Sequence, residues 1–142
     1  MVDEKQILKA AVHAFVINDN KLLMSIRSKN GEPYLWGVPG GHVDDIEVSS
    51  QALIREMKEE INLDINKGEF KLVFSMHRAG VNKPYFCTFF EVETNLANLK
   101  NNEPEKCDEL KWFDLDELPE NIVPYIKKAI NAYLDGEIYL ED

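Results

Sequence analysis

A glycine pair followed by a long run without Gly or Pro is the feature that most constrains how this chain folds. The pair is Gly40 and Gly41, and the run extends from about Glu47 to Ile61. Apolar side chains recur in it every four residues, at Leu53, Met57 and Ile61. That spacing places them in one stripe of an α-helix. Asn62 follows where helices commonly end in a left-handed residue, a conformation that Asn tolerates well. The sequence therefore predicts an amphipathic helix that is preceded by a loop containing two glycines.

Three acidic side chains project from one face of this helix. Glu56, Glu59 and Glu60 are related by i,i+3 and i,i+4 spacing. Like charges at this spacing repel each other and raise carboxylate pKa values unless a cation binds between them. Carboxylate oxygens suit Mg²⁺ or Mn²⁺, and Mg²⁺ commonly joins protein carboxylates to substrate phosphates. We therefore expect a divalent metal here, with a neighbouring carboxylate accepting a proton from the water that attacks phosphorus.

Each of these residues also has a purely structural interpretation. Considered alone, Glu59 and Glu60 would be interpreted as a solvated helix face. Arg55 alone would be interpreted as the partner of Glu59 in a surface ion pair, and the two glycines alone would be interpreted as a simple turn. The joint spacing of the acids, Arg55 and the glycine pair favours a catalytic site over these interpretations.

The same segment resembles a Nudix box, the signature of a family of hydrolases. Eight positions match its pattern, namely Gly41, Glu47, Arg55, Glu56, Met57, Glu59, Glu60 and Leu63. Asn62 stands where the pattern has its final Gly, and Asn is itself a suitable helix cap. The resemblance continues before the box in Trp36 to Gly41 and after it in Trp112 to Pro119. It implies a magnesium-dependent enzyme that cleaves a diphosphate linkage of a nucleoside diphosphate derivative.

The resemblance also implies a role for each residue of the box. Glu56, Glu59 and Glu60 would bind the metal together with the Gly40 carbonyl, and Glu56 or Glu59 would also activate water. Arg55 would orient the carboxylates. Glu47 would contact the metal shell or position Arg55.

Outside these acids, two residues are candidates for contact with the substrate and one for the metal. Gly41 and Arg27 are the substrate candidates, although Arg27 is equally well interpreted as an exposed strand residue. Glu105 lies in a loop from which some relatives supply a further metal ligand or base, but loop acids are commonly solvated. The three histidines, His13, His42 and His77, are interpreted as structural or incidental, because the expected chemistry needs no imidazole.

The resemblance favours one substrate class and leaves two alternatives open. The short chain and its segment around Glu105 are similar to members that hydrolyse nucleoside triphosphates, oxidised nucleotides included, to a monophosphate and pyrophosphate. The first alternative is hydrolysis of ADP-ribose or another nucleoside diphosphate conjugate. The second is a noncatalytic regulator that binds nucleotides.

Strand patterns surround the predicted helix. Residues 7–17 and 22–26 are apolar runs joined by Asp19-Asn20, which predicts a hairpin. Residues 70–77 and 85–92 form a second strand pair with a bend at 79–82, and 111–114 forms a short strand. A second helix is expected from Pro124 to just before Gly136, with Ile126, Ile130 and Tyr133 facing the core. These elements predict an α/β fold, a Nudix-type α/β/α sandwich with a mixed β-sheet.

Size and charge bound the remaining possibilities. The 142 residues are expected to form one domain, and the net charge of -10 argues against a nucleic acid polymer as partner. No apolar run approaches the roughly 20 residues that span a bilayer, so no membrane partner is expected. The amino terminus resembles no secretory signal, and two cysteines form no disulfide framework. The expected partner is a small nucleotide and the expected compartment is the cytoplasm, while the oligomeric state stays open.

Overall fold

The computed structural model describes residues 7–27, 34–80 and 84–142. In chain order its elements are β1 (Lys9–Asn18), β2 (Lys21–Arg27), β3 (Leu35–Gly37), β4 (Gly40–His42), α1 (Ser49–Ile61), β5 (Phe70–Arg78), β6 (Tyr85–Val92), β7 (Glu109–Asp114), α2 (Pro124–Leu134) and β8 (Tyr139–Glu141).

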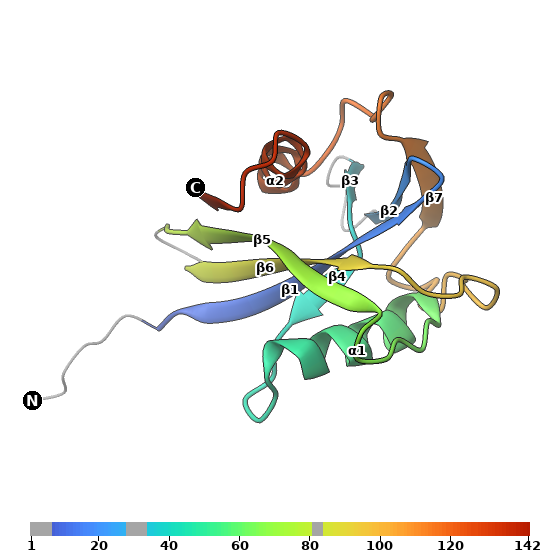
Figure 1. Ribbon diagram of the computed structural model, residues 1–142, viewed down its shortest axis with the longest axis horizontal. Coiled ribbons are helices and arrows are strands. Elements are labelled where there is room, and N and C mark those ends of the chain that lie inside the picture. The colour runs from blue at the N-terminus through green and yellow to red at the C-terminus, as the bar shows by residue number, and fades with distance from the viewer. Residues whose placement is uncertain (1–6, 28–33, 81–83) are drawn as a thin grey trace, which may run out of the picture.

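The strands form one mixed sheet, and β1 pairs with three other strands in it. It pairs parallel with β6 along its length and antiparallel with the short β4. Beyond β6 the sheet continues through antiparallel β5 to parallel β8. At its other end β1 turns into β2, which pairs antiparallel with both β3 and β7. Figure 1 shows β1 running between these two parts of the sheet.

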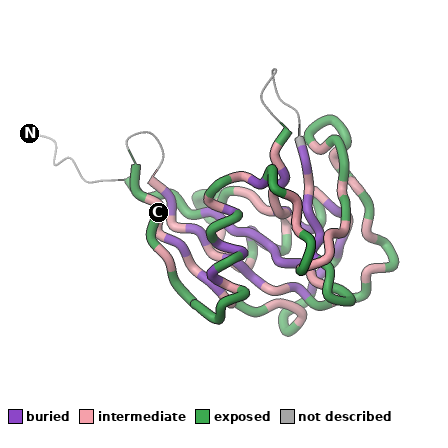
Figure 2. Tube along the Cα trace, turned by 90° about the horizontal axis from the view of Figure 1, so that it is seen from above, coloured by how far each residue is buried: buried purple, intermediate pink, exposed green. Residues whose placement is uncertain are grey.

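One helix covers each face of the sheet. The buried residues of α1 (Ala52, Leu53, Met57 and Ile61) pack on Val12, Ala14, Val16 and Phe90. The buried residues of α2 (Ile126, Ala129, Ile130 and Ala132) pack in a second cluster with Phe15, Phe74, Met76 and Phe89. Consecutive residues of β1 are therefore buried on alternate faces, which explains its unbroken apolar sequence. Figure 2 shows buried stretches along these strands, and the α/β/α sandwich with a mixed sheet is confirmed.

Local features agree with the sequence to within a few residues. Asp19 and Asn20 both have positive φ, 56° and 62°, as a tight hairpin turn requires. Asn62 caps α1 with φ 57° and ψ 35°, in the left-handed region. Helix α1 begins at Ser49 rather than Glu47, because the Glu47 amide closes a turn onto the Asp44 carbonyl at 3.0 Å.

Some predicted features differ or lie outside the described residues. The strands β3, β4 and β8 have three residues each, too few to show a periodicity in sequence. Part of the bend expected at 79–82 falls in residues 81–83, which are outside the described part of the chain. Neither described helix combines the length and the apolar character needed to cross a membrane.

Candidate active site

The glycine pair forms strand β4, which lies between β1 and α1. Gly40 pairs with His13 and Gly41 with Val12. A Cβ on Gly40 would lie 2.3 Å from the Val12 carbonyl oxygen, so only glycine fits this close approach of two backbones. On its other side the Gly40 amide donates to Glu60 Oε2 at 3.3 Å. The glycine loop is thereby fixed against both the sheet and the acidic helix.

Gly41 provides the space that holds the Glu56 carboxylate. A Cβ on Gly41 would lie 2.3 Å from Glu56 Oε1 and 2.7 Å from Oε2. The Glu56 side chain is only 14% exposed, and the missing Cβ is what lets its carboxylate pack against the backbone. The first glycine of the box and the first acidic residue of α1 are therefore complementary in shape.

Arg55 is the hub of the acidic cluster. Its Nε and Nη2 donate to the two carboxylate oxygens of Glu47 at 2.7 and 2.9 Å. Its Nη1 donates to Glu56 Oε1 at 2.9 Å and to Glu59 Oε2 at 3.3 Å. Nη2 also donates to the His42 carbonyl at 3.1 Å. One guanidinium thus ties the start of the box, the glycine strand and the acidic face of α1 together.

The electrostatics follow from these contacts. The hydrogen bond from Arg55, followed by the backbone amide of Asp44, lowers the pKa of Glu47 to about 2. The same bond to Glu47 raises the pKa of Arg55 above its ordinary value. Arg55 therefore relieves the repulsion that the sequence led us to assign to a metal ion. The predicted crowding of like charges is correct, but it does not by itself require a metal.

The donor set suits a hard divalent cation. Glu56, Glu59, Glu60 and the Gly40 carbonyl offer only oxygen, which is the ligand chemistry of Mg²⁺ and Mn²⁺. Within residues 7–27, 34–80 and 84–142, no three acidic, His or Cys side chains are grouped as a metal site, and Nη1 of Arg55 instead holds Glu56 and Glu59. Metal binding at these carboxylates stays a prediction.

The other two predicted residues are Arg27 and Glu105. Arg27 ends β2 opposite Leu35, and its side chain is outside the described part of the structure. Glu105 is exposed in the loop between β6 and β7. That loop is anchored on α1, because the Asn102 amide donates to the Glu60 carbonyl at 2.9 Å. No described contact joins Glu105 to the carboxylate cluster.

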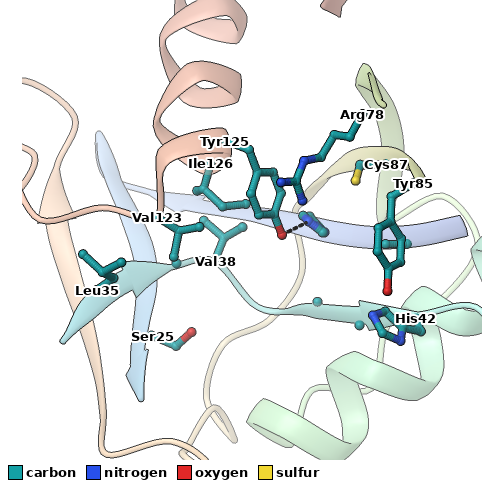
Figure 3. Close-up of a pocket in the computed structure, with 15 residues that line it drawn as sticks. Ser25, Leu35, Val38, His42, Arg78, Tyr85, Cys87, Val123, Tyr125 and Ile126 are labelled. Carbon is teal, nitrogen blue, oxygen red and sulfur yellow. Dashed lines mark hydrogen bonds between the residues drawn. The ribbon is translucent and has the colours of Figure 1, made fainter. Parts of the chain in front are cut away.

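A pocket of about 420 Å³ opens beside the glycine strand (Figure 3). Gly40, Gly41 and His42 form one side, and Leu35, Val38, Val123 and Ile126 supply apolar walls. The remaining walls include His13, Arg78, Tyr85, Cys87 and Tyr125. The Arg78 guanidinium lies over the Tyr125 ring, 3.8 Å from its centroid. The pocket therefore combines apolar surface with a few directional polar groups, as small-molecule sites commonly do.

His13 is the buried polar residue of this pocket. Its Nε2 lies 3.1 Å from the Tyr125 hydroxyl, while its buried Nδ1 has no partner in the structure. Burial above all, then the charges of Arg78 and His42, lowers the pKa of His13 to about 3. His13 is thus neutral, which agrees with the structural role inferred for it. His77, by contrast, packs near the Phe86 ring in the β5–β6 pair.

Sequence patterns did not identify the pocket residues Arg78 and Tyr125. They are separated by 47 positions and belong to β5 and α2, so no local spacing links them. Arg78 ends a strand pattern in which a charged residue is unremarkable. Only the packing of α2 over β5 brings the two side chains together.

Comparison with known proteins identifies related sequences. A family model described as NUDIX domain matches residues 7–133. An ADP-ribose pyrophosphatase from Methanocaldococcus jannaschii is 29% identical over 124 residues, covering 87% of this chain and 72% of the relative. A CTP pyrophosphohydrolase from Escherichia coli K12 is 35% identical over 60 residues, covering 42% of this chain and 44% of the relative. The chain therefore aligns with less than half of that second protein.

A solved structure has the same architecture. The crystal structure of MutT NUDIX hydrolase from Burkholderia pseudomallei matches with a TM-score of 0.78 and 23% identity, covering 89% of this chain and 98% of that one. At this identity the likeness establishes the fold.

Proposed function

The chain belongs to the NUDIX domain family, and from this premise we propose that it hydrolyses a nucleoside triphosphate to a nucleoside monophosphate and pyrophosphate with Mg²⁺. Family membership makes it a hydrolase that acts on diphosphate linkages. The substrate, the products and the metal are what we propose. Mn²⁺ is an equivalent metal for the same oxygen donors. The net charge of -10 favours a free nucleotide over a polymer.

One observation carries the proposal: the carboxylate of Glu56 is seated on Gly41 at the edge of the pocket. The acidic face of α1 and a cavity of small-molecule size therefore share the glycine strand as a common wall. A nucleotide in the pocket would have its diphosphate next to the carboxylates.

The residues divide the work in the proposed reaction. Glu56, Glu59, Glu60 and the Gly40 carbonyl would hold the metal, with Glu105 as a further ligand from the loop. When bound, the metal would neutralise the diphosphate and stabilise the departing pyrophosphate. Glu56 or Glu59 would accept the proton of the attacking water.

Two residues would position the others. Glu47 holds Arg55 through both its carboxylate oxygens, at 2.7 and 2.9 Å. Arg55 in turn orients Glu56 and Glu59 through Nη1. Gly41 and Arg27 would contact the substrate phosphates, and Gly41 would do so through its backbone, because it lines the pocket.

A second candidate, hydrolysis of ADP-ribose, is favoured by a specific observation. The archaeal relative that covers 87% of this chain is called an ADP-ribose pyrophosphatase. The CTP pyrophosphohydrolase favours the triphosphate, but its match covers 42% of the chain. The chemistry at α1 is the same in both candidates, and the pocket would decide between them.

A substrate panel tests the proposal. The protein would be incubated with nucleoside triphosphates, their oxidised forms and ADP-ribose, with Mg²⁺ or with a chelator, and the products identified by mass. We expect monophosphate and pyrophosphate from a triphosphate, with no product under chelation. Orthophosphate and a nucleoside diphosphate would contradict the proposal. Cleavage of ADP-ribose alone would establish the second candidate, and nucleotide binding without any cleavage would indicate a regulator.

A further inference from the structure

Arg78 is the only residue with a permanent charge among the described residues that line the pocket. Its guanidinium is held at two points. Nε donates to Asp142 Oδ2 at 3.3 Å, and the plane lies over the Tyr125 ring at 3.8 Å. Asp142 is itself fixed, because its other oxygen accepts from Lys128 at 2.6 Å and its amide donates to the His77 carbonyl at 3.0 Å. A cation with so few degrees of freedom is preorganised for a directional contact.

The contact between Arg78 and Asp142 is made by Nε rather than by a terminal amino group. Figure 3 shows the Arg78 side chain reaching from β5 toward Tyr125 among the residues that line the pocket. A guanidinium donates hydrogen bonds and accepts none. A ligand group that forms hydrogen bonds with Arg78 must therefore present acceptor atoms to it.

The sheet places Arg78 far from the expected position of the diphosphate. Gly41 is on β4, and three pairings separate β4 from β5, through β1 and β6. Neighbouring strands lie about 4.8 Å apart, so the two backbones are separated by roughly 14 Å. Arg78 reaches back over β6, where Cys87 also lines the pocket. A nucleotide whose diphosphate lies at Gly41 would have its base, rather than its phosphates, near Arg78.

The base that fits such a donor can be named by its chemistry. A 6-oxopurine such as guanine presents the acceptors O6 and N7 on one edge, and bidentate hydrogen bonds from Arg or Lys to these two atoms are the commonest specific contact in protein–DNA complexes. Adenine presents an amino donor at the same position, which would face the donors of Arg78. The apolar walls would accommodate the flat faces of either base.

Given the proposed function, we propose that Arg78 determines base specificity: it donates to the O6 edge of a 6-oxopurine, and the enzyme prefers such nucleotides over adenine nucleotides. Asp142 is the positioning residue, because it fixes the guanidinium without lining the pocket. The Tyr125 ring packs against one face of the Arg78 guanidinium.

The test compares two nucleotides that differ on this edge, ITP and ATP. The ratio of their kcat/KM values would be measured for the wild type and for Arg78→Met, Arg78→Lys and Asp142→Asn. We expect the wild type to prefer ITP by roughly 10- to 100-fold. Arg78→Met is expected to remove most of this preference. Arg78→Lys keeps the charge but loses the planar fork, so it should restore little of it. Asp142→Asn should weaken the preference partially.

A matched control and a second readout make the result decisive. Lys127→Met changes the neighbouring exposed lysine of α2 and leaves the contacts of Asp142 with Arg78 and Lys128 in place, so the ratio should stay at the wild-type value. Binding of IMP and AMP, measured by calorimetry without metal, reports the base preference independently of hydrolysis. Melting curves would confirm that each variant is folded.

The outcomes separate this inference from the proposed function. If the wild type binds IMP over AMP through Arg78 but cleaves no triphosphate, the inference about the base holds and the triphosphate reaction is wrong. If triphosphates are cleaved and Arg78→Met lowers ITP and ATP equally, Arg78 does not read the base. An unchanged ratio in folded Arg78→Met, or a wild type without preference in both assays, would overturn the inference.

Discussion

The acidic cluster and the pocket share the glycine strand but are built in opposite ways. The cluster is assembled from one continuous stretch, in which Glu47, Arg55, Glu56 and Glu59 are joined by hydrogen bonds of 2.7 to 3.3 Å. The pocket draws on strands β1, β2, β3, β4, β5 and β6 and on helix α2, and its described lining has one permanent charge, that of Arg78. The cluster offers general phosphate chemistry, whereas the pocket offers shape and a few directed donors.

We therefore expect the acidic cluster to determine the turnover rate and the pocket to determine which substrate is preferred. Changes in the cluster should alter turnover for every accepted substrate by a similar factor. Changes in the pocket should alter the relative rates of different substrates.

Glu59→Gln should have the largest effect. Its carboxylate is 48% exposed and makes a single 3.3 Å contact with Arg55, so the fold should be retained. Loss of a general base or metal ligand is expected to lower turnover by roughly 100-fold or more. The loss should be equal for all accepted nucleotides when kcat is measured at saturating Mg²⁺. Full activity of a folded Glu59→Gln variant would remove this carboxylate from the mechanism.

Thiol reactivity probes the pocket without any mutation. Cys87 is buried in the pocket wall, and burial raises the pKa of its thiol to about 11, from an ordinary value of 9.0. Because the thiolate is the reactive form, alkylation of Cys87 at pH 8 should be roughly 100-fold slower than that of an ordinary thiol. Its rate should rise about tenfold per pH unit until the pKa is reached.

Ligands then distinguish the two regions. A nucleoside monophosphate that fills the pocket should slow alkylation of Cys87 further, whereas Mg²⁺ alone should leave the rate unchanged. Alkylation followed by mass spectrometry would measure both effects, with half-buried Cys107 as the internal reference. Equal protection of both thiols by a monophosphate would show that the ligand does not enter this pocket.

The two glycines of β4 should respond differently to alanine. In Gly41→Ala the new Cβ meets the end of the flexible Glu56 side chain, which can move aside. Turnover should therefore fall by roughly tenfold while stability changes little. In Gly40→Ala the Cβ meets the Val12 carbonyl at 2.3 Å, which is backbone and cannot yield. We expect that variant to lose about 1–3 kcal/mol of unfolding free energy in denaturant titrations. The reverse pattern would contradict the assigned contacts.

Asn62→Gly should have the smallest effect. Glycine suits the left-handed φ of 57° better than Asn, but the substitution loses the hydrogen bond from Nδ2 to the Asn98 carbonyl at 3.0 Å. These contributions oppose each other, so we expect the free energy of unfolding to change by about 0.5 kcal/mol or less. Turnover should stay at the wild-type value. Asn62→Ala loses both the hydrogen bond to Asn98 and the tolerance for a left-handed backbone, so it should lower the free energy of unfolding by about 1–2 kcal/mol.

The sequence could predict the acidic cluster because the cluster is local. Helical spacing places Glu56, Glu59 and Arg55 on one face whatever the rest of the fold does. The long strands and both helices were predictable for a similar reason, since each carries its own periodicity. The particular hydrogen bonds from Arg55 to Glu47, Glu56 and Glu59 were not predictable, because spacing alone does not fix side-chain conformation.

The pocket could not be predicted in this way. Contact between Arg78 and Tyr125 depends on the register of β5 and on how α2 packs over the sheet. The short strands β3 and β4 depend on pairing with partners distant in sequence, as Gly40 with His13 illustrates. Such contacts arise from tertiary packing, and no pattern within a single segment records them.

Mg²⁺ binding at Glu56 can be measured through its effect on thermal stability. Melting temperatures would be measured across a Mg²⁺ titration at constant ionic strength for the wild type, Glu56→Gln and the control Glu137→Gln, an exposed site beyond α2. Without metal, Glu56→Gln should melt near the wild type, because losing its Arg55 contact is offset by relief of charge repulsion. With Mg²⁺, the wild type and Glu137→Gln should be stabilised alike, and Glu56→Gln should need at least about tenfold more Mg²⁺ for the same shift. Equal magnesium-induced shifts in all three proteins would contradict a metal site on the acidic face of α1.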